Sequence, residues 1–388
     1  MILQKGKIDY LLLIAVVFLT VVGLTFIYTA SSAKAAEKFG DSAYFLKRQL
    51  VRVVLGLVAM ALIMRVDYHR IVKHAPWIFW PALTILLFLL FAPESWSVRG
   101  TRRWISLMGV QFQPSELAKY ALIFMLTRVL TLPGIDMKKF TDGVLPQLIL
   151  TAMVCGTVLL EPDASTALMI FFIALMILFA AGAKAVHLFN VLMAGLLITV
   201  VTLMMNSYQR SRILSFISSL GNENELGWQV RQSLISLGSG GFFGVGLGQS
   251  QQKMHWLPDP FTDFIFSIIG EELGFLGTLT VLLMFVLIIY RGFRIALNAP
   301  DTEGQLLAVG ITGTIGLYAF VNMAVITHLV PTTGIPMPFI SYGGSSLVTT
   351  LAATGILLNI SYQGSLKFAR TRVGSRHARR SKKSFFGL

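Results

Sequence analysis

Ten apolar stretches run through this 388-residue chain, and each can cross the hydrocarbon core of a bilayer, which takes about 20 helical residues. Only 13% of the residues are charged, whereas soluble domains carry about 25%, so lipid is the expected solvent. The sequence therefore predicts an all-α, polytopic membrane protein with one membrane domain over residues 1–366. The expected transmembrane helices lie near residues 10–30, 50–66, 76–92, 115–130, 144–160, 165–181, 184–206, 264–290, 305–329 and 341–362.

Basic residues are distributed unevenly among the connections between these stretches. The connections after the second, fourth, sixth and eighth stretches carry lysine or arginine, whereas those after the fifth and ninth carry none. Cytoplasmic loops are enriched in basic residues, so this alternation places both termini in the cytoplasm, although Lys34, Lys38, Lys47 and Arg48 break the pattern. The net charge of +14 thus reflects membrane topology and does not indicate a nucleic-acid partner. The basic tail, residues 367–388, is expected to be disordered and to lie against anionic lipid headgroups.

Three acids lie at or inside the eighth apolar stretch. Asp263 stands where a loop becomes a membrane helix, and Glu271 and Glu272 follow within the same stretch. A carboxylate at membrane depth costs several kcal/mol unless it is solvated, paired or used, so such a residue indicates a functional site. The alternative is an acid favoured by the dipole at a helix start, which explains Asp263 better than the two glutamates.

The connection between the seventh and eighth stretches, residues 207–262, is the largest outer loop. Its tryptophans, phenylalanines and glycines disfavour disorder, so we expect short amphipathic helices at the outer interface. Basic residues in the outer loops either contact lipid headgroups or form a pocket for an anionic ligand such as a lipid-linked pyrophosphate. These residues are Arg102, Arg103, Arg210, Arg212, Arg231 and Lys253.

Two further segments carry polar residues into the membrane. Glu116 and Lys119 lie three residues apart, so they share a helix face and either neutralise each other or face a water-filled cavity. Residues 332–346 are rich in proline and glycine and include Ser341 and Tyr342. Irregular backbone at membrane depth is tolerated only where it lines a cavity or is buried in protein.

Several motifs follow one another in order between Asp9 and about Ser361. They are Arg102–Ile105, Gln113–Lys119, Glu161–Asp163, Tyr208–Arg212, Gln232–Ile235, Gly238–Gly241, Thr262–Phe266 and Pro338–Ser346. With these motifs the chain resembles the SEDS family (shape, elongation, division and sporulation), which includes the FtsW and RodA polymerases. The family usually reads Pro-Glu-Ala-His-Thr-Asp before the eighth span, whereas Asp259 replaces the glutamate and Phe261 the histidine here. Residues 269–274 look more like the division (FtsW) branch.

The resemblance implies a peptidoglycan glycosyltransferase that polymerises lipid II outside the cytoplasmic membrane, working with a class B penicillin-binding protein and with other divisome or elongasome proteins. It places the family's essential acid at Asp263, which can act as a base, while positive groups hold the departing polyprenyl pyrophosphate. A divalent cation, Mg²⁺ or Mn²⁺, could assist. The expected substrate-binding residues are Arg102, Arg103, Glu116, Lys119, Arg210, Arg212, Gln232, Ser233, Lys253, Ser341 and Tyr342.

Two other functions compete with this interpretation. A lipid II flippase would explain the intramembrane acids and the interrupted segments near the C-terminus. No inverted repeat is visible, however, and the polar residues gather at one face instead of the midplane. A scaffold that only recruits division proteins is a weaker third alternative.

Overall fold

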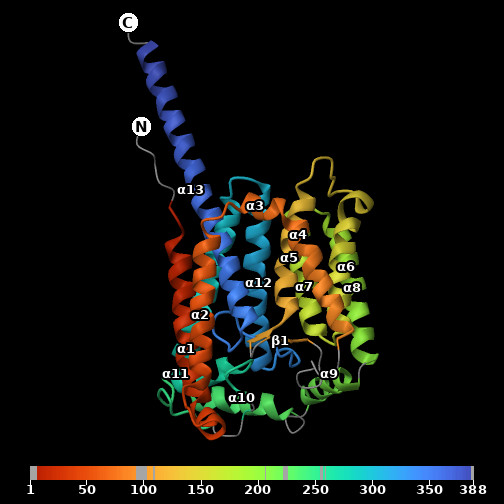
Figure 1. The fold of residues 1–388 in the computed structure, drawn as a ribbon, viewed down its shortest axis with the longest axis vertical. Helices are drawn as coiled ribbons and strands as arrows, with labels where there is room; N and C mark the ends of the chain where they lie inside the picture. Colours follow the sequence, from red (N-terminus) through yellow and green to blue (C-terminus); the bar gives the residue numbers. More distant parts are fainter. Residues whose placement is uncertain are drawn as a thin grey trace.

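The computed structural model describes residues 7–92, 103–107, 110–205, 207–221, 226–253, 257 and 259–385. Ten long helices in these ranges form one bundle, and successive helices run in opposite directions (Figure 1). This confirms the predicted all-α, ten-span architecture, although only six of the helices qualify as spans by length and hydropathy alone. The ten are α1 (Tyr10–Phe39), α2 (Tyr44–Ile63), α4 (Ala75–Leu90), α5 (Pro114–Leu130), α6 (Leu145–Leu160), α7 (Ala164–Ala180), α8 (Ala185–Met205), α11 (Ile265–Leu297), α12 (Thr302–Ile326) and α13 (Ser345–Phe385).

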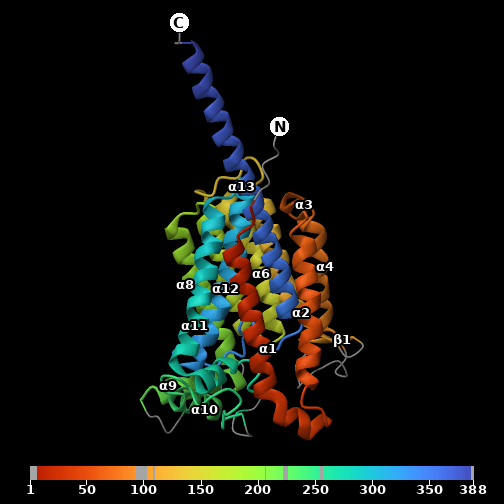
Figure 2. The same ribbon diagram turned by 90° about the vertical axis from the view of Figure 1, so that its left-hand side faces the viewer.

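The two ends of the bundle differ in what they carry. α1 begins and α13 leaves the bundle at one end, which we call the terminal end (Figures 1 and 2). The opposite end, which we call the loop end, carries the helices of the large loop, so that loop is folded as the sequence predicts. The smaller elements are α3 (Tyr68–Lys73), the π-helical turn η2 (Phe140–Val144), α9 (Ser207–Ser219), α10 (Trp228–Ser239) and an unpredicted antiparallel hairpin of β1 (Ile105–Leu107) and β2 (Val110–Phe112).

Two helices are longer than the sequence predicts. α1 continues past the expected end at residue 30 to Phe39, where Gly40 adopts a left-handed conformation and caps it. α13 continues through most of the tail to Phe385 and projects from the bundle (Figure 1). Residues 367–385 contain no proline, and lysine, arginine and alanine are good helix formers, which suits a helical tail. The expected disorder of the tail stays a prediction.

α11 is broken near its loop end, where the large loop packs against it. Gly274 has φ 65° and ψ −160°, which no helix allows, and Gly244 also has a positive φ of 82°. A Cβ on Gly274 would lie 2.3 Å from the backbone nitrogen of Gly244, and one on Gly244 would lie 2.2 Å from the carbonyl oxygen of Glu272. Loop and helix thus meet backbone against backbone, which only glycine permits.

α12 and α8 mark the inside and the outside of the bundle. Most of α12 is buried, and its apolar side chains join the main core. α8 has no buried residue among those described and lies at the periphery (Figures 1 and 2). This contrast leaves α8 in contact mainly with lipid.

Candidate active site

Asp263 lies at the loop end, directly before α11. The helix begins at Ile265, and its N-cap residue Phe264 makes no side-chain hydrogen bond. The Thr262 hydroxyl lies 2.7 Å from Asp263 Oδ1 and donates to it. Asp263 is partly exposed, and no bond from its carboxylate to the start of α11 is present. Helix capping therefore does not account for this acid.

The Asp263 segment is fixed to the irregular chain that precedes α13. The backbone N–H of Tyr342 donates to the carbonyl oxygen of Phe261 at 2.9 Å. The buried Asn322 amide of α12 donates at 2.8 Å both to the Asp263 carbonyl and to the Ile335 carbonyl. Asn322 was missed by our sequence analysis, although an amide inside an otherwise apolar helix is a signal that could have revealed it.

The surroundings of Asp263 adjust its basicity. Burial raises the pKa of this carboxyl above its ordinary value, and the charge of Asp259 adds to the rise. The Thr262 hydrogen bond and the positive charge of Arg212 act in the opposite direction. A carboxylate whose pKa is raised toward neutrality is a stronger general base than an exposed aspartate.

Arg212, whose charge acts on Asp263, lines a small cavity. Its guanidinium, carried by α9, donates to the carbonyl oxygen of Thr332 at 3.3 Å. The cavity has a volume of about 260 Å³ and is lined in part by Arg212, Ser215, Ser219, Trp228, His328 and Thr332. Arg210 lies on the same helix and is exposed, whereas the predicted Arg102 falls outside the described residues.

Arg103 holds the turn between α6 and α7. Its guanidinium donates to the carbonyl oxygens of Glu161 (2.8 Å) and Pro162, and lies 3.6 Å from the Asp163 carboxylate. Burial raises the pKa of Glu161 to about 8, with a further rise from Asp163 and an opposing effect from Arg103. Arg103 is thus engaged by the protein, which favours a structural role over the predicted contact with substrate.

Glu116 and Lys119 form an ion pair inside the bundle. Lys119 Nζ lies 2.6 Å from Glu116 Oε2, and the two side chains are 1% and 3% exposed. The Lys119 ammonium also lies 4.0 Å from the ring centroid of Tyr318. Of the two alternatives for this pair, mutual neutralisation or a water-filled cavity, the ion pair favours mutual neutralisation. The predicted contact with substrate stays a prediction.

Lys253 and the two glutamates of α11 anchor the glycine-rich part of the large loop. Lys253 Nζ is buried 3.0 Å from Glu272 Oε1. Glu271 accepts hydrogen bonds from the hydroxyls of Ser236 (2.9 Å) and Ser250 (2.6 Å). The predicted role of Lys253 in holding pyrophosphate is therefore unsupported, because its charge is already used within the protein.

Three of the other predicted residues, Ser233, Ser341 and Tyr342, also have protein partners. The buried Ser233 hydroxyl lies 2.8 Å from the Val230 carbonyl and 3.1 Å from the Ile326 carbonyl, and the Ser341 hydroxyl accepts from the Met337 N–H at 2.8 Å. Gln232, next to Ser233 in α10, is buried. The ring of Tyr342 lies under the Arg52 guanidinium, 4.6 Å from its centroid. Of these, only Tyr342 is partly exposed.

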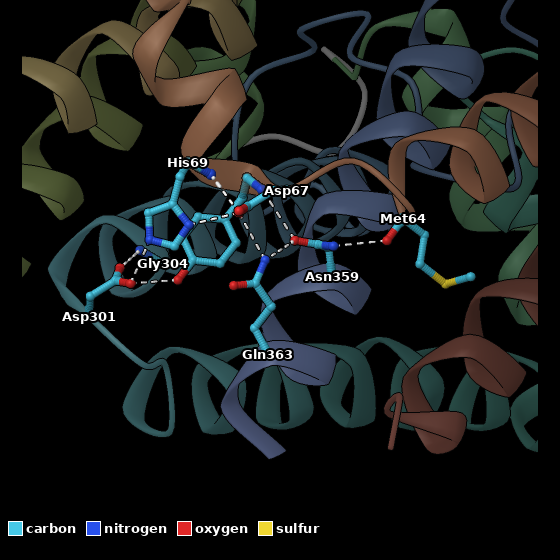
Figure 3. Close-up of polar contacts among 8 residues, drawn as sticks. Met64, Asp67, His69, Asp301, Gly304, Asn359 and Gln363 are labelled. Carbon is cyan, nitrogen blue, oxygen red and sulfur yellow. Dashed lines mark hydrogen bonds and ion pairs between the residues drawn. The ribbon is translucent and has the colours of Figure 1, made fainter. Parts of the chain in front are cut away.

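A second polar cluster, which the sequence analysis missed, lies at the terminal end (Figure 3). The ring nitrogens of His69 lie 2.7 Å from Asp67 and 2.9 Å from Asp301. Gln363 of α13 donates to Asp67 at 2.9 Å, so the cluster joins three parts of the bundle. Asp301 and Gln363 lie over 200 residues from Asp67 and His69 in sequence, so no local pattern predicts the cluster.

Metal ligands do not gather at either end within the described ranges. No three histidine, cysteine, aspartate or glutamate side chains there could hold a metal ion together. A divalent cation at the loop end would therefore depend on substrate phosphates for most of its ligands, as Mg²⁺ commonly does.

Known proteins resemble this chain over nearly its whole length. The profile of the FtsW/RodA/SpoVE family, described as cell cycle proteins, matches residues 10–366. The probable peptidoglycan glycosyltransferase FtsW of Geobacter sulfurreducens is 43% identical over 356 residues, which cover 92% of this chain and 95% of that one. Stage V sporulation protein E of Bacillus subtilis is 40% identical over 364 residues, covering 92% and 98%.

Solved structures agree with this relationship. A chain from a study of how a peptidoglycan synthase complex coordinates polymerization and crosslinking superposes with a TM-score of 0.75, at 29% identity, over 92% of this chain and 98% of its own length. The rod shape determining protein RodA of Thermus thermophilus gives a TM-score of 0.67, also at 29% identity, over 92% and 97%. The chain therefore belongs to the FtsW/RodA/SpoVE family of cell cycle proteins.

Proposed function

We propose that this protein is a peptidoglycan glycosyltransferase that polymerises lipid II at the loop end, with Asp263 as the general base. The single observation that carries the residue assignment is a partly buried carboxylate of raised pKa next to an arginine and a cavity. The names of the relatives support the activity. The loop end would then face outward, and both termini would lie on the cytoplasmic side of the cytoplasmic membrane.

The proposed reaction uses the oxygen of Asp263 that Thr262 does not contact. A Cβ on Gly334 would lie 3.8 Å from Oδ2, so the glycine leaves space beside this oxygen. Asp263 takes the proton from the acceptor sugar hydroxyl, the hydroxyl oxygen bonds to the anomeric carbon of the donor, and the bond to pyrophosphate breaks. One carboxylate favours displacement with inversion over a covalent intermediate.

The leaving pyrophosphate is assigned to the cavity at Arg212. A guanidinium stabilises the charge that develops on phosphate oxygens, and the serine hydroxyls around it supply further donors. Arg210, exposed on the same helix, would attract the anion from the membrane surface. Arg103, Lys253, Glu116 and Lys119 are left out of this site because the protein already uses them.

An apolar cavity suits the polyprenyl chain of the substrate. It has a volume of about 690 Å³ and lies between α6, α7 and α8, with few polar side chains among its lining residues. A hydrocarbon chain can enter such a cavity from the lipid beside α8, whereas a charged sugar-pyrophosphate headgroup would lose its hydration there. We therefore assign this cavity to the lipid tail of the substrate.

The class B penicillin-binding protein is proposed to dock through one transmembrane helix on α11. The run Leu279–Tyr290 offers Leu283, Val286 and Tyr290, which are exposed on one side of the helix. The solved synthase complex supports a crosslinking partner, and 43% identity to an FtsW favours a place in the septal divisome over the elongasome. Charged substitutions at these three positions should abolish co-purification with the partner.

Labelled lipid II supplied to the purified full-length protein tests the function. We expect glycan chains when the protein is incubated with its penicillin-binding partner in detergent. Lipid translocation in vesicles without chain formation would support the flippase, and neither activity would support the scaffold.

A further inference from the structure

The extension of α1 beyond its expected end reaches the segment that carries Asp263. Lys34 Nζ lies 2.6 Å from Asp259 Oδ1, so this ion pair joins residues 225 positions apart. The two side chains are 45% and 21% exposed, and Asp259 is the better shielded of the two. α1 therefore contacts the candidate site through one charged side chain.

Asp259 begins the tight turn that ends at Asp263. Its φ of 46° is unusual for a residue other than glycine. Its carbonyl oxygen accepts the Thr262 N–H at 3.1 Å and lies 2.7 Å from the Thr262 hydroxyl. The same hydroxyl lies 2.7 Å from Asp263 Oδ1, so the contacts run from Lys34 through Asp259 and Thr262 to the carboxylate.

We propose that Lys34 is a positioning residue for Asp263, acting through Asp259 and Thr262. The inference rests on the proposed role of Asp263 as the base. The ion pair holds the strained turn in place and neutralises the negative charge nearest to Asp263. Asp259 in place of the family's usual glutamate is one methylene shorter, and Lys34 on the extended α1 reaches it.

Few charged groups face Asp263 within the described ranges. α9 contributes Arg212, and the turn contributes Asp259 together with its partner Lys34. α12 contributes the neutral Asn322, and the chain before α13 contributes the backbone of Gly334. Loss of Lys34 would remove a positive charge next to Asp259, which disfavours the ionised form of Asp263.

The test is lipid II polymerisation by the full-length protein with its partner, measured from pH 5.5 to 9. Lys34→Gln should lower the rate about 3- to 10-fold, because small displacements of a base are costly. Lys34→Gln should also shift the acidic limb of the pH profile to higher pH, whereas Asp259→Asn should shift it to lower pH. Lys34→Arg should restore the wild-type rate and the wild-type position of the acidic limb. The double variant, Lys34→Gln with Asp259→Asn, should have the pH profile of Asp259→Asn alone.

Lys38→Gln is the matched control, since Lys38 is exposed on the same extension and its ammonium lies 5.7 Å from the Phe39 ring centroid. A Lys34→Gln variant that behaves like this control overturns the inference. An equal loss at every pH, without a shift of the limb, overturns it in favour of a purely structural ion pair. If Asp263→Asn remains active, the proposed function fails instead, whatever Lys34→Gln does.

Discussion

Asp263 at the loop end and the two aspartates of the polar cluster at the terminal end have opposite surroundings. At the terminal end, Asp301 accepts hydrogen bonds from the Gly304 N–H and the Tyr68 hydroxyl and contacts His69, and Asp67 is equally well bonded. Burial pushes the pKa of Asp67 upward, but hydrogen bonds from Gln363 and His69 outweigh it and lower the pKa. At the loop end, the Thr262 hydroxyl and the backbone N–H of Asp263 itself bond to the Asp263 carboxylate, but burial outweighs them and raises its pKa.

This difference separates structural acids from a reactive one. A carboxylate that already accepts several hydrogen bonds is stabilised as the anion and is a weak base. A buried carboxylate with few donors has a free oxygen and gains stability when it takes a proton. The terminal end is thus organised to hold helices together, whereas Asp263 has the surroundings expected of the general base that we propose.

Removal of the Asp263 charge should have the largest effect. Asp263→Asn keeps size and shape but removes basicity, so polymerisation should fall about 10²-fold or more while the melting temperature is retained. Asp263→Glu should also be poor, because an added methylene misplaces the base. If the Asp263→Asn variant synthesised glycan near the wild-type rate, Asp263 would not differ in role from the acids at the terminal end.

Two arginines at the loop end should respond differently to truncation. Arg212→Ala should lower polymerisation about 10-fold or more with little change in melting, because it removes charge stabilisation of the leaving group. Arg103→Ala should instead destabilise the protein by about 1–3 kcal/mol, because the α6–α7 turn loses its charged donor. Rate and melting temperature measured on both variants check this, and equal behaviour would contradict the assignment.

Asp301→Ala is the reciprocal test at the terminal end. The change removes the N-cap of α12 and the partner of Tyr68 and His69, so stability should fall by about 1–2 kcal/mol. The rate of polymerisation per folded molecule should stay near the wild-type value. A selective loss of rate at unchanged stability would indicate that the two ends are coupled.

The smallest expected effect is the change in protein stability with pH as His69 titrates. Burial lowers the pKa of His69, but Asp67 and Asp301 outweigh it and raise the pKa. The stabilisation from His69 is complete below about pH 6.5 and is lost as the pH rises through the raised pKa of the imidazole. The stabilisation from Asp67 is lost as the pH falls below about 4. His69→Gln should remove the loss of stability at alkaline pH, which is worth about 1 kcal/mol or less for such exposed groups. Melting curves from pH 5 to 9 would reveal it.

The sequence predicted features that depend on local composition. Runs of apolar residues revealed the ten helices, and an acid at the start of such a run identified Asp263 as a candidate. The partners of Lys34, Lys253 and His69 could not be predicted, because 19 to 232 residues separate each from its acid and only the packed bundle brings them together. For the same reason, the contacts of Arg103 with the turn at Glu161 could not be distinguished from contacts with substrate, whereas Glu116, three residues from Lys119, was predicted as its partner.

The contact between Gly244 and Gly274 has a consequence for exchange of parts between family members. No side chain fits between Gly244 and Gly274. A loop from another family member that places a side chain here therefore cannot be accommodated by a compensating substitution in the helix. A chimaera would have to transfer residues 240–277 as one block, including both glycines and the break in α11. The large loop and the first turns of α11 therefore form one structural unit.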